Sequence, residues 1–485
     1  MTARVLVLGA GPAGLSAAER LLERGHGRLR VHVAHMQDVL GGKAASWRDD
    51  QGVLVEHGWH MVVGFYDRLF ALMKRAGIDR DSALTSMHGD SHCYEPASNE
   101  VYTMNSGGGK LGVAARFSFY QGLPAEDRFH FARVMTQAFA IAGSGQDLTR
   151  HDDICFDTWA VELGLRPHMT RYALFRFLRI AYFNFPQQIS AYHVLQTLKN
   201  VSTSEHAELF VCRAGSTESL WNPVGDHLRR LGATIEGSVL ATDFVYRGDR
   251  IIGVRVGSAP PTGPLSAESI DDLTVLPGTA RVLSDFDFVL STLPVECLKR
   301  MNRDDDRMWR SSFFRRLENL RSVATMSLTI VTRRPIDPRF RGPVHGFAAP
   351  FTFFVNMKPY WREYADDEAI GAVLVFGGQE AGFEGWTDQQ IIDFTLENVQ
   401  STLGALLLLD VVSIELHRND KPWERLLLAE PGVDQFRPDP LTPFRNLFLA
   451  GDWVKNRVNL VSMEGAVCSG QEAADLLLAR IAEER

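Results

Sequence analysis

Three glycines near the start of the chain stand at a spacing that suits phosphate binding. Residues 9–14 read Gly-Ala-Gly-Pro-Ala-Gly, the pattern G-x-G-x-x-G. In this pattern Gly9 permits a tight turn, Gly11 lets a pyrophosphate approach the backbone, and Gly14 lets a helix pack closely on a strand. The apolar run 4–8 and the alanine-rich segment after the turn supply the strand and helix that the pattern requires. We therefore expect a bound dinucleotide, with a glycine turn in an unrelated strand–helix unit as the alternative.

A second chemical motif lies near the other end of the chain. The segment Asn-Leu-Phe-Leu-Ala at 446–450 is expected to be a strand that leads into Gly451 and Asp452, and a helix is expected over Ala466–Ala479, just after Met463. A buried strand with an acidic residue at its tip can bind a ribityl hydroxyl, and a helix start can face an anionic flavin carbonyl. NAD needs the first motif alone, whereas FAD is long enough to span both. The two motifs together therefore favour FAD.

Composition and charge narrow the function classes. The 485 residues are 45% hydrophobic and 23% charged, as in ordinary globular proteins, and two or three lobes are expected at this length. The net charge of −8 gives no basic footprint for nucleic acid. The five cysteines are scattered and the early histidines match no ligand spacing, so we expect neither disulfides nor a metal site. No apolar run is long enough to span a membrane, and we expect a cytoplasmic protein with membrane-surface contact left open.

The elements that would position both motifs come from the two ends of the chain. We expect strands near 4–8, 29–36, 233–240, 286–292, 322–331, 351–355, 372–376 and 446–450. Helices are expected at 15–24, 66–76, 126–142, 169–183, 388–403 and 466–479. Ten of the 29 phenylalanines fall between 115 and 185, which indicates a dense core or a wall around something large and apolar.

This arrangement predicts one nucleotide domain with a substrate domain inserted twice. The FAD-binding domain would be discontinuous, with the segments 1–85, 206–300 and 426–485. The substrate-binding domain, with its helical and aromatic-rich lobe, would comprise 86–205 and 301–425. The division follows from the placement of the motifs, since no internal repeat marks it.

Several segments resemble the flavin-dependent amine oxidase and phytoene desaturase superfamily. Within it, they are most similar to the plant- and cyanobacterial-type phytoene and ζ-carotene desaturases. The resemblance covers about a quarter of the chain, in the stretches 39–47, 56–66, 69–77, 431–439 and 448–466. It implies an α/β fold, with a Rossmann-like FAD-binding domain and an interleaved α+β substrate domain.

The resemblance also implies which residues hold FAD, without a covalent bond. They are Gly9, Gly11, Pro12, Ala13, Gly14, His35, Gly41, Gly42, Lys43, Gly58, Trp59, His60, Val239, Gly451, Asp452 and Met463. Gly58, Trp59 and His60 would lie near the isoalloxazine ring. Val239 would contact the adenine through its backbone, and Met463 would lie by the pyrimidine edge.

His35 is a departure from this family's pattern. A carboxylate usually ends the second strand and binds the adenosine ribose about 20 residues after the last glycine. A neutral imidazole accepts one hydrogen bond where a carboxylate accepts two. Gln37 also replaces a residue that is normally basic. We expect weaker FAD binding or a rearranged contact, and a harmless exchange is an equal alternative.

The resemblance implies desaturation of a long apolar isoprenoid, with a hydride passing to flavin N5. His60 is the candidate for acid or base work, and packing against the cofactor is its alternative. A quinone, oxygen or a redox partner must then take the electrons, because no second G-x-G-x-x-G offers a site for NAD(P)H. Arg171, Arg176 and Arg179 share one face of the expected helix at 169–183, as a lipid-binding edge or as a solvated edge of a core helix.

Three other functions remain open from the sequence. A flavin oxidase of an amine or specialised metabolite would need an aromatic cage and a polar site. An enzyme similar to hydroxysqualene dehydroxylases would remove a hydroxyl from an isoprenoid. A non-catalytic isoprenoid carrier, similar to Rab GDP-dissociation inhibitors, would lack an intact phosphate turn and Gly-Asp tip, and this chain has both.

Overall fold

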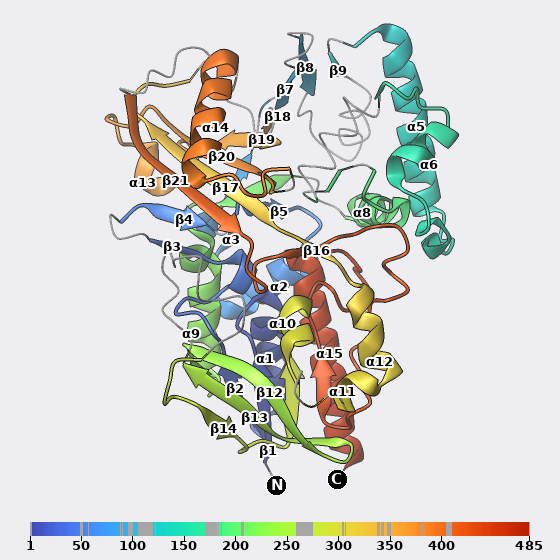
Figure 1. The fold of residues 1–485 in the computed structure, drawn as a ribbon, viewed down its shortest axis with the longest axis vertical. Coiled ribbons are helices and arrows are strands. Elements are labelled where there is room, and N and C mark those ends of the chain that lie inside the picture. The colour runs from blue at the N-terminus through green and yellow to red at the C-terminus, as the bar shows by residue number, and fades with distance from the viewer. Residues whose placement is uncertain are drawn as a thin grey trace.

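The computed structural model shows an elongated molecule of two stacked parts, with both termini at the lower end in Figure 1. It describes residues 2–48, 52–56, 58–87, 89, 91–95, 100–104, 120–121, 123–169, 182, 184–185, 187–204, 208–258, 275–302, 305, 307–336, 340, 344–346, 351–380, 382–403 and 410–484.

A five-stranded parallel sheet forms the centre of the lower part. Its order is β11-β2-β1-β15-β23, with all neighbours parallel. The strands are β1 (Ala3–Leu8), β2 (Leu29–Ala34), β11 (Thr234–Glu236), β15 (Phe288–Ser291) and β23 (Leu447–Leu449). The two central strands β1 and β15 are mainly apolar because helices or strands cover both faces. This sheet confirms the expected α/β class.

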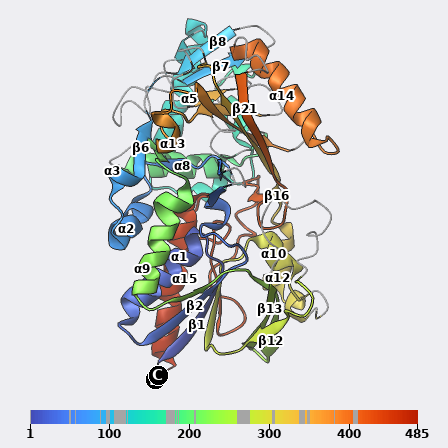
Figure 2. The same cartoon turned by 90° about the vertical axis from the view of Figure 1, so that its left-hand side faces the viewer.

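Each face of this sheet has its own cover. Helices α1 (Pro12–Gly25), α9 (Asn222–Arg230) and α15 (Met463–Glu483) share the hydrophobic core on one face. The other face packs against the antiparallel sheet of β12 (Val239–Arg247), β13 (Arg250–Ser258) and β14 (Arg281–Leu283), as Figure 2 shows. Helices α1 and α15 cross closely, since a Cβ on Gly470 would lie 2.1 Å from the Ala13 carbonyl oxygen.

The upper part contains an eight-stranded sheet in the order β21-β17-β20-β19-β18-β7-β8-β9. Its strands are β7 (Ser91–Glu95), β8 (Glu100–Met104), β9 (Tyr120–Gln121), β17 (Thr325–Thr332), β18 (His345–Gly346), β19 (Phe353–Asn356), β20 (Ala372–Gln379) and β21 (Val411–Asn419). Beside it lie α5 (Ala125–Gly143), α6 (Phe156–Glu162), α8 (Ala191–Thr203) and α14 (Asp388–Leu403).

Short elements connect the two parts. The smaller sheets pair β3 (Ser46–Arg48), β4 (Leu54–Glu56), β5 (Val62–Val63), β6 (Leu84–Met87), β10 (Leu209–Cys212), β16 (Ser322–Val323) and β22 (Leu426–Leu427). The remaining α-helices are α2 (Asp67–Ala76), α3 (Arg80–Ala83), α10 (Val295–Arg300), α11 (Arg307–Arg310), α12 (Ser312–Arg315) and α13 (Arg362–Ala365).

The strands of the two large sheets come from different segments of the sequence. Those of the five-stranded sheet fall in the segments assigned to the FAD domain, and those of the eight-stranded sheet fall in the segments assigned to the substrate domain. Residues 307–320 differ, because Met308, Phe314 and Leu317 pack in the lower core with β12 and β13. The lower core therefore extends past residue 300.

Some elements differ from the sequence expectation. The strand expected over 233–240 is broken into β11 and β12, because Ser238 adopts a left-handed conformation with φ +56°. The last helix begins at Met463, capped by the Ser462 hydroxyl, rather than at Ala466. The helix expected over 169–183 lies almost entirely outside the described residues. Among the described helices, none is both long and apolar enough to cross a membrane.

Candidate cofactor and substrate cleft

A cleft of about 310 Å³ lies where the two parts meet, lined by residues from both ends of the chain. All the predicted cofactor residues line it except Gly14 and Gly41, which support the two glycine turns from behind. The roles assigned to them individually stay predictions.

The first glycine turn is built from three glycines with different surroundings. Gly9 has φ +106°, and a Cβ there would lie 2.5 Å from Oγ1 of Thr292. A Cβ on Gly14 would lie 2.0 Å from the Gly9 carbonyl oxygen, so strand and helix need glycine to pack. A Cβ on Gly11 would find its nearest atom 3.7 Å away, which leaves room for a ligand. Gly11 caps α1 without a side-chain hydrogen bond, so the first-turn N–H groups suit a phosphate.

The second glycine turn is held against the first. The Gly41 N–H donates to the Ala10 carbonyl at 2.9 Å. Gly41 has φ +119°, and a Cβ there would lie 2.5 Å from Cδ1 of Trp221. The Trp221 indole in turn donates to the Ala44 carbonyl at 2.7 Å. This packing places Gly42 and Lys43 at the cleft wall.

Lys43 and Asp452 bring opposite charges together from distant parts of the sequence. Nζ of Lys43 lies 3.6 Å from Oδ2 of Asp452 and donates to the Arg425 carbonyl at 3.3 Å. Among the described lining residues, these two are the only Asp, Glu, Lys or Arg side chains. The pair can serve phosphate and ribityl groups, and the rest of the wall is neutral or apolar.

His60 has a defined tautomer in its neutral form. Its Nε2 lies 2.9 Å from the Lys43 carbonyl, and because a carbonyl only accepts, Nε2 carries the hydrogen. Nδ1 is then the acceptor, and it lies 3.8 Å from Oε2 of Glu56, beyond hydrogen-bond range. Nδ1 and the buried Nε1 of Trp59 have no hydrogen-bond partner among the described residues. Both orphaned atoms belong to cleft-lining residues, which fits a cofactor or substrate bound there.

The end of β2 carries a neutral histidine. Burial lowers the pKa of His35 to about 4, assisted by Arg229 and opposed by Asp38. The His35 carbonyl accepts from the Val239 N–H at 2.8 Å, so both residues lie together on the wall. An uncharged imidazole therefore stands at the site predicted for the ribose, and its contact with the ribose stays a prediction.

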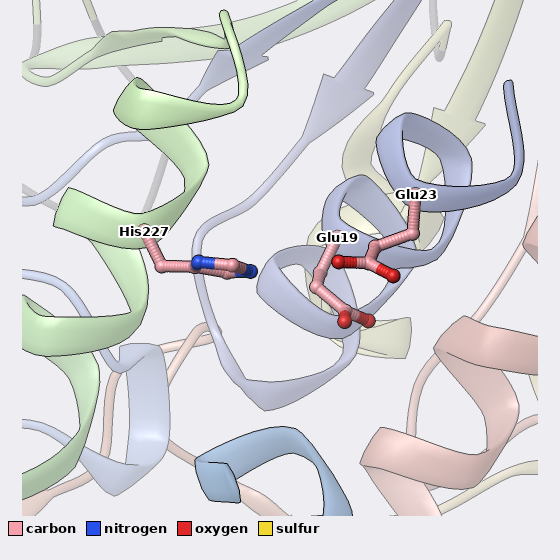
Figure 3. A group of neighbouring side chains, drawn as sticks. All are labelled: Glu19, Glu23 and His227. Atoms are coloured by element: carbon pink, nitrogen blue, oxygen red, sulfur yellow. The ribbon is translucent and has the colours of Figure 1, made fainter. Parts of the chain in front are cut away.

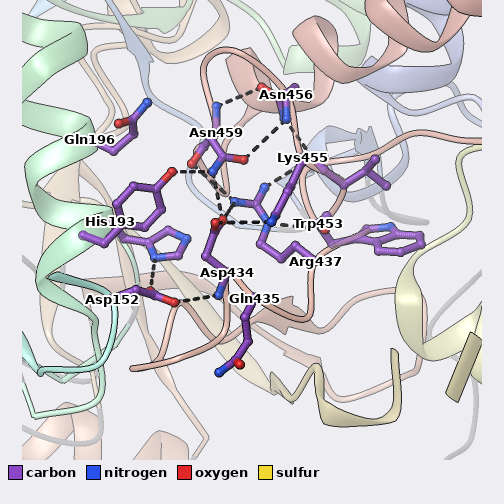
Figure 4. A network of polar contacts seen from close by, with 12 residues as sticks. Asp152, His193, Gln196, Asp434, Gln435, Arg437, Trp453, Lys455, Asn456 and Asn459 are labelled. Atoms are coloured by element: carbon purple, nitrogen blue, oxygen red, sulfur yellow. Dashed lines mark hydrogen bonds and ion pairs between the residues drawn. The ribbon is translucent and has the colours of Figure 1, made fainter. Parts of the chain in front are cut away.

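Arg437 is completely buried and donates hydrogen bonds to the loop that carries Asp452. Figure 4 shows it within a network of polar contacts. Its guanidinium donates to Oδ1 of Asp434 at 3.3 Å and to four loop carbonyls, those of Asp452 (2.8 Å), Trp453 (3.3 Å), Val454 (3.3 Å) and Asn459 (3.5 Å). Burial lowers the pKa of Arg437, and the nearby Asp434 opposes that shift. Loop geometry at the cleft therefore depends on one arginine.

The same network reaches into the upper part of the molecule. Nδ2 of Asn459 donates to the Tyr192 hydroxyl at 2.6 Å and to Asp434 at 2.9 Å. The Asp434 N–H donates to Oδ2 of Asp152 at 2.9 Å. Because Tyr192 belongs to α8, the network connects the loop that carries Asp452, between β23 and α15, to this helix of the upper part.

Sequence reasoning missed several lining residues, among them Tyr66, Tyr182, Asn184, Cys297, Thr325 and Trp423. Burial raises the pKa of the Tyr66 and Tyr182 phenols, so both are neutral. It also raises the pKa of the Cys297 thiol to about 12. Tyr66 ends the stretch 56–66 that resembles the family, whereas the other five follow no motif and only their folded positions bring them to the cleft.

A separate group of Glu19, Glu23 and His227 lies between α1 and α9, as Figure 3 shows. Its ligand atoms are within 4.8 Å of one another. Nη2 of Arg75 donates to Oε2 of Glu19 at 3.1 Å, so the buried carboxylate already has a cationic partner. We assign no metal to this group.

Comparison with known proteins decides the family. The pattern of the family described as flavin containing amine oxidoreductase matches residues 12–478. The chain belongs to this family. It is therefore an FAD-dependent oxidoreductase, and its glycine turns, Lys43–Asp452 pair and orphaned polar atoms fit FAD. The hypothesis of a non-catalytic carrier is not retained.

Curated relatives of this flavoprotein are carotenoid desaturases. The chain is 26% identical to 15-cis-phytoene desaturase of Synechococcus elongatus, over 98% of this chain and 96% of the relative. It is 24% identical to that of Arabidopsis thaliana, over 96% and 78%, and 25% identical to a probable zeta-carotene desaturase of S. elongatus, over 98% of both.

Solved structures of oxidases share the fold of this flavoprotein. Putrescine oxidase superposes with a TM-score of 0.68 at 16% identity, covering 99% of both chains. Cyclohexylamine oxidase from Brevibacterium oxydans gives a TM-score of 0.69 at 15% identity, covering both chains completely. At these identities the likeness concerns the fold alone.

Proposed function

We propose that this flavoprotein desaturates a long apolar isoprenoid of the carotene type. The observation that carries the proposal is the cleft itself, which joins the glycine turns to a largely apolar wall. That wall includes Met61, Leu293, Leu426, Leu427, Ala429 and Val461. The similarity to phytoene and ζ-carotene desaturases supports the same substrate class.

When bound, FAD supplies the acceptor, at N5, for a hydride from the substrate. The chain's own contribution is to hold the apolar substrate in the cleft and to exclude water. His60 can take up the substrate proton at Nδ1, because Nε2 donates to the Lys43 carbonyl. A charged His60 would be stabilised by Glu56 at 3.8 Å.

Anaerobic turnover tests this proposal directly. The FAD-loaded protein is mixed with phytoene or ζ-carotene in detergent, and flavin bleaching and the polyene products are recorded together. We expect bleaching with a new conjugated double bond, and His60→Gln should slow the reaction by about 10- to 100-fold with little change in FAD affinity. Ser202→Ala, at an exposed site on α8, serves as the control. A flavin-loaded protein that leaves both polyenes unchanged would contradict the assignment.

An amine oxidase remains the second candidate, because the aromatic residues Trp59, Tyr66, Tyr182 and Trp423 line the cleft. Aromatic faces attract a protonated amine. Such an amine would also pair with a carboxylate, but the lining carboxylate of Asp452 is already paired with Lys43. Bleaching by amines but not by polyenes would favour this alternative. The same assay with hydroxylated isoprenoids tests for a dehydroxylase.

We also propose a quinone or oxygen as the electron acceptor. After anaerobic bleaching, a soluble quinone or air is added and flavin absorbance is followed. Recovery with the quinone, and slow recovery in air, would identify a quinone-dependent enzyme. The reverse would identify an oxidase, and recovery with neither would contradict both.

We propose a cytoplasmic location with contact at a membrane surface, since an apolar isoprenoid partitions into lipid. Phe129 supports this, because it is 67% exposed on α5. We expect the protein to sediment with anionic vesicles and the variant Phe129→Ser, or the triple variant Arg171→Glu, Arg176→Glu, Arg179→Glu, to sediment less. Unchanged sedimentation of both variants would remove this idea.

A further inference from the structure

Asn184 is one of two cleft-lining residues, with Trp59, that offer a buried side-chain hydrogen-bond donor without an acceptor among the described residues. Asn184 lines the cleft and is only 1% exposed. Its Nδ2 group has no hydrogen-bond partner among the described residues. Buried donors in native proteins are nearly always paired, so an unpaired one at a ligand cleft indicates a partner supplied by the ligand.

Neighbouring amides fix which atom of Asn184 is free. The backbone N–H of Phe185 donates to Oε1 of Gln188 at 3.1 Å. That oxygen also accepts from Nε2 of Gln379 at 3.3 Å, and the same Nε2 donates to Oδ1 of Asn184 at 3.4 Å. Because the backbone N–H can only donate, the order of donors and acceptors has one consistent direction, and Nδ2 is the free end. Oε1 of Gln379 also lacks a partner, but Gln379 does not line the cleft.

Asn184 belongs to the substrate side of the cleft. Its partner Gln379 ends β20 and pairs in register with Thr325, the first residue of β17, which also lines the cleft. Both strands belong to the eight-stranded sheet in the upper part, whereas the glycine turns belong to the lower sheet (Figure 1). The donor therefore comes with the upper part rather than with the phosphate-binding turns.

The two nearby phenols are already hydrogen-bonded, so Nδ2 of Asn184 and Nε1 of Trp59 are the buried side-chain donors of the described cleft wall that lack a partner. The Tyr182 hydroxyl donates to the His193 carbonyl at 3.2 Å, and the Tyr66 hydroxyl is hydrogen-bonded to Ser462. A neutral N–H donor needs a lone pair, which a hydroxyl or carbonyl oxygen offers and an ammonium group does not. A pure hydrocarbon would leave Asn184 unpaired in the complex.

We propose that the substrate is an apolar molecule with one acceptor oxygen, a hydroxyl or a carbonyl, which accepts a hydrogen bond from Nδ2 of Asn184. This inference rests on the proposed function and adds one oxygen to its long apolar isoprenoid, so that oxygen-bearing isoprenoids should bind in preference to carotene hydrocarbons. The hydrogen bond would fix how far the chain slides into the cleft, and hence which carbons face the flavin. Asn184 is thus a specificity-determining residue.

Matched ligand pairs test the proposal. A carotene and its hydroxylated and keto derivatives are titrated into the FAD-loaded protein, with the change in flavin absorbance as the readout of binding. We expect the oxygenated ligands to bind about tenfold more tightly than the hydrocarbon. Asn184→Leu, which keeps the branching and the number of heavy atoms, should reduce that ratio to within about twofold, while FAD affinity and the ligand-free flavin spectrum stay unchanged. Gln187→Leu, at an exposed position three residues away, is the control.

Each other outcome is decisive. Equal binding of the pair by the wild-type protein would overturn the inference and leave the proposed function standing. A preference for the oxygenated ligand that survives in Asn184→Leu would also overturn the inference, since Nδ2 of Asn184 would not bind the ligand oxygen. A loss of FAD affinity in that variant would overturn it as well, since the donor would then serve the cofactor. If neither hydrocarbon nor oxygenated isoprenoid perturbs a flavin that still photoreduces normally, the proposed function fails as well.

Discussion

At the scale of single residues, two buried titratable groups near the cleft have pKa values shifted in opposite directions. Burial lowers the pKa of His35 to about 4 and raises that of Glu464 to about 7. Unfolded His35 binds its proton near pH 6.5, so the native state loses stability as pH falls from 6.5 towards 4. Unfolded Glu464 releases its proton near pH 4.5, so the native state loses stability as pH rises from 4.5 to 7.

Substitution of His35 and substitution of Glu464 should therefore change the pH dependence of the unfolding free energy in opposite directions. Relative to the wild type, His35→Gln should gain about 1–2 kcal/mol in unfolding free energy when the pH is lowered from about 7 to about 5. Glu464→Gln should lose a similar amount over the same change, because it no longer gains from protonation. Urea unfolding of the FAD-free protein at both pH values measures this. Parallel profiles for wild type and either variant would contradict the corresponding shift.

Substitutions at two glycines of the first turn should have different effects, one on stability and the other on FAD binding. Gly14→Ala should destabilise the FAD-free protein by several kcal/mol, since its Cβ would lie 2.0 Å from a backbone oxygen. Gly11→Ala should leave that stability almost unchanged, because its Cβ meets nothing within 3.7 Å and projects into ligand space. Thermal unfolding and FAD titration of both variants test this. We expect Gly11→Ala to lower FAD affinity at least tenfold, and normal affinity would show that the pyrophosphate lies elsewhere.

At the scale of elements, the loop between β23 and α15 should depend on Arg437. Arg437→Met should cost about 3–5 kcal/mol of unfolding free energy, because it leaves the buried Asp434 without its closest cation. FAD affinity should fall too, because the Asp452 carbonyl loses a donor at 2.8 Å. Denaturant unfolding and FAD titration give the two readouts.

A second substitution separates the two effects of that change. Adding Asp434→Leu to Arg437→Met removes the uncompensated carboxylate, so part of the stability should return. FAD affinity should stay low, because the loop carbonyls still lack the guanidinium. If affinity returned together with stability, Arg437 would act on the fold alone and not on loop geometry.

Elements with a local chemical reason could be predicted from sequence, and those that depend on distant partners could not. The first turn depends on spacing within six residues, so Gly9, Gly11 and Gly14 were recognisable. By contrast, Glu464 accepts from the first N–H groups of α2, at 2.8 Å from Arg68, almost 400 positions away. The amide relay that ends at Asn184 likewise joins β20 to a turn before α8. No periodicity encodes such pairs, so the first glycine turn was predictable from sequence, whereas the part of the cleft wall that includes Asn184 was not.

At the scale of the whole molecule, the polar network should allow FAD binding to stabilise both the lower and the upper part. Nδ2 of Asn459 donates to the Tyr192 hydroxyl at 2.6 Å, and the Val458 carbonyl accepts from Nε2 of Gln196 at 3.2 Å and from Nδ2 of Asn200 at 3.3 Å. These three contacts join the loop between β23 and α15 to α8. A ligand that orders the loop therefore also restricts opening of α8, since it stabilises the states in which these bonds are made.

Hydrogen exchange can measure this coupling. Addition of FAD should slow amide exchange in residues 452–462 and also in α8, by about three- to tenfold at saturating FAD. In the triple variant Tyr192→Phe, Gln196→Leu, Asn200→Leu, FAD should still protect the loop, but protection of α8 should be largely lost because none of the three bonds remains. Ser202→Ala, on the exposed face of α8, should behave as wild type. Protection of α8 that persists in the triple variant would mean that the two parts communicate through the cleft wall instead of through this network.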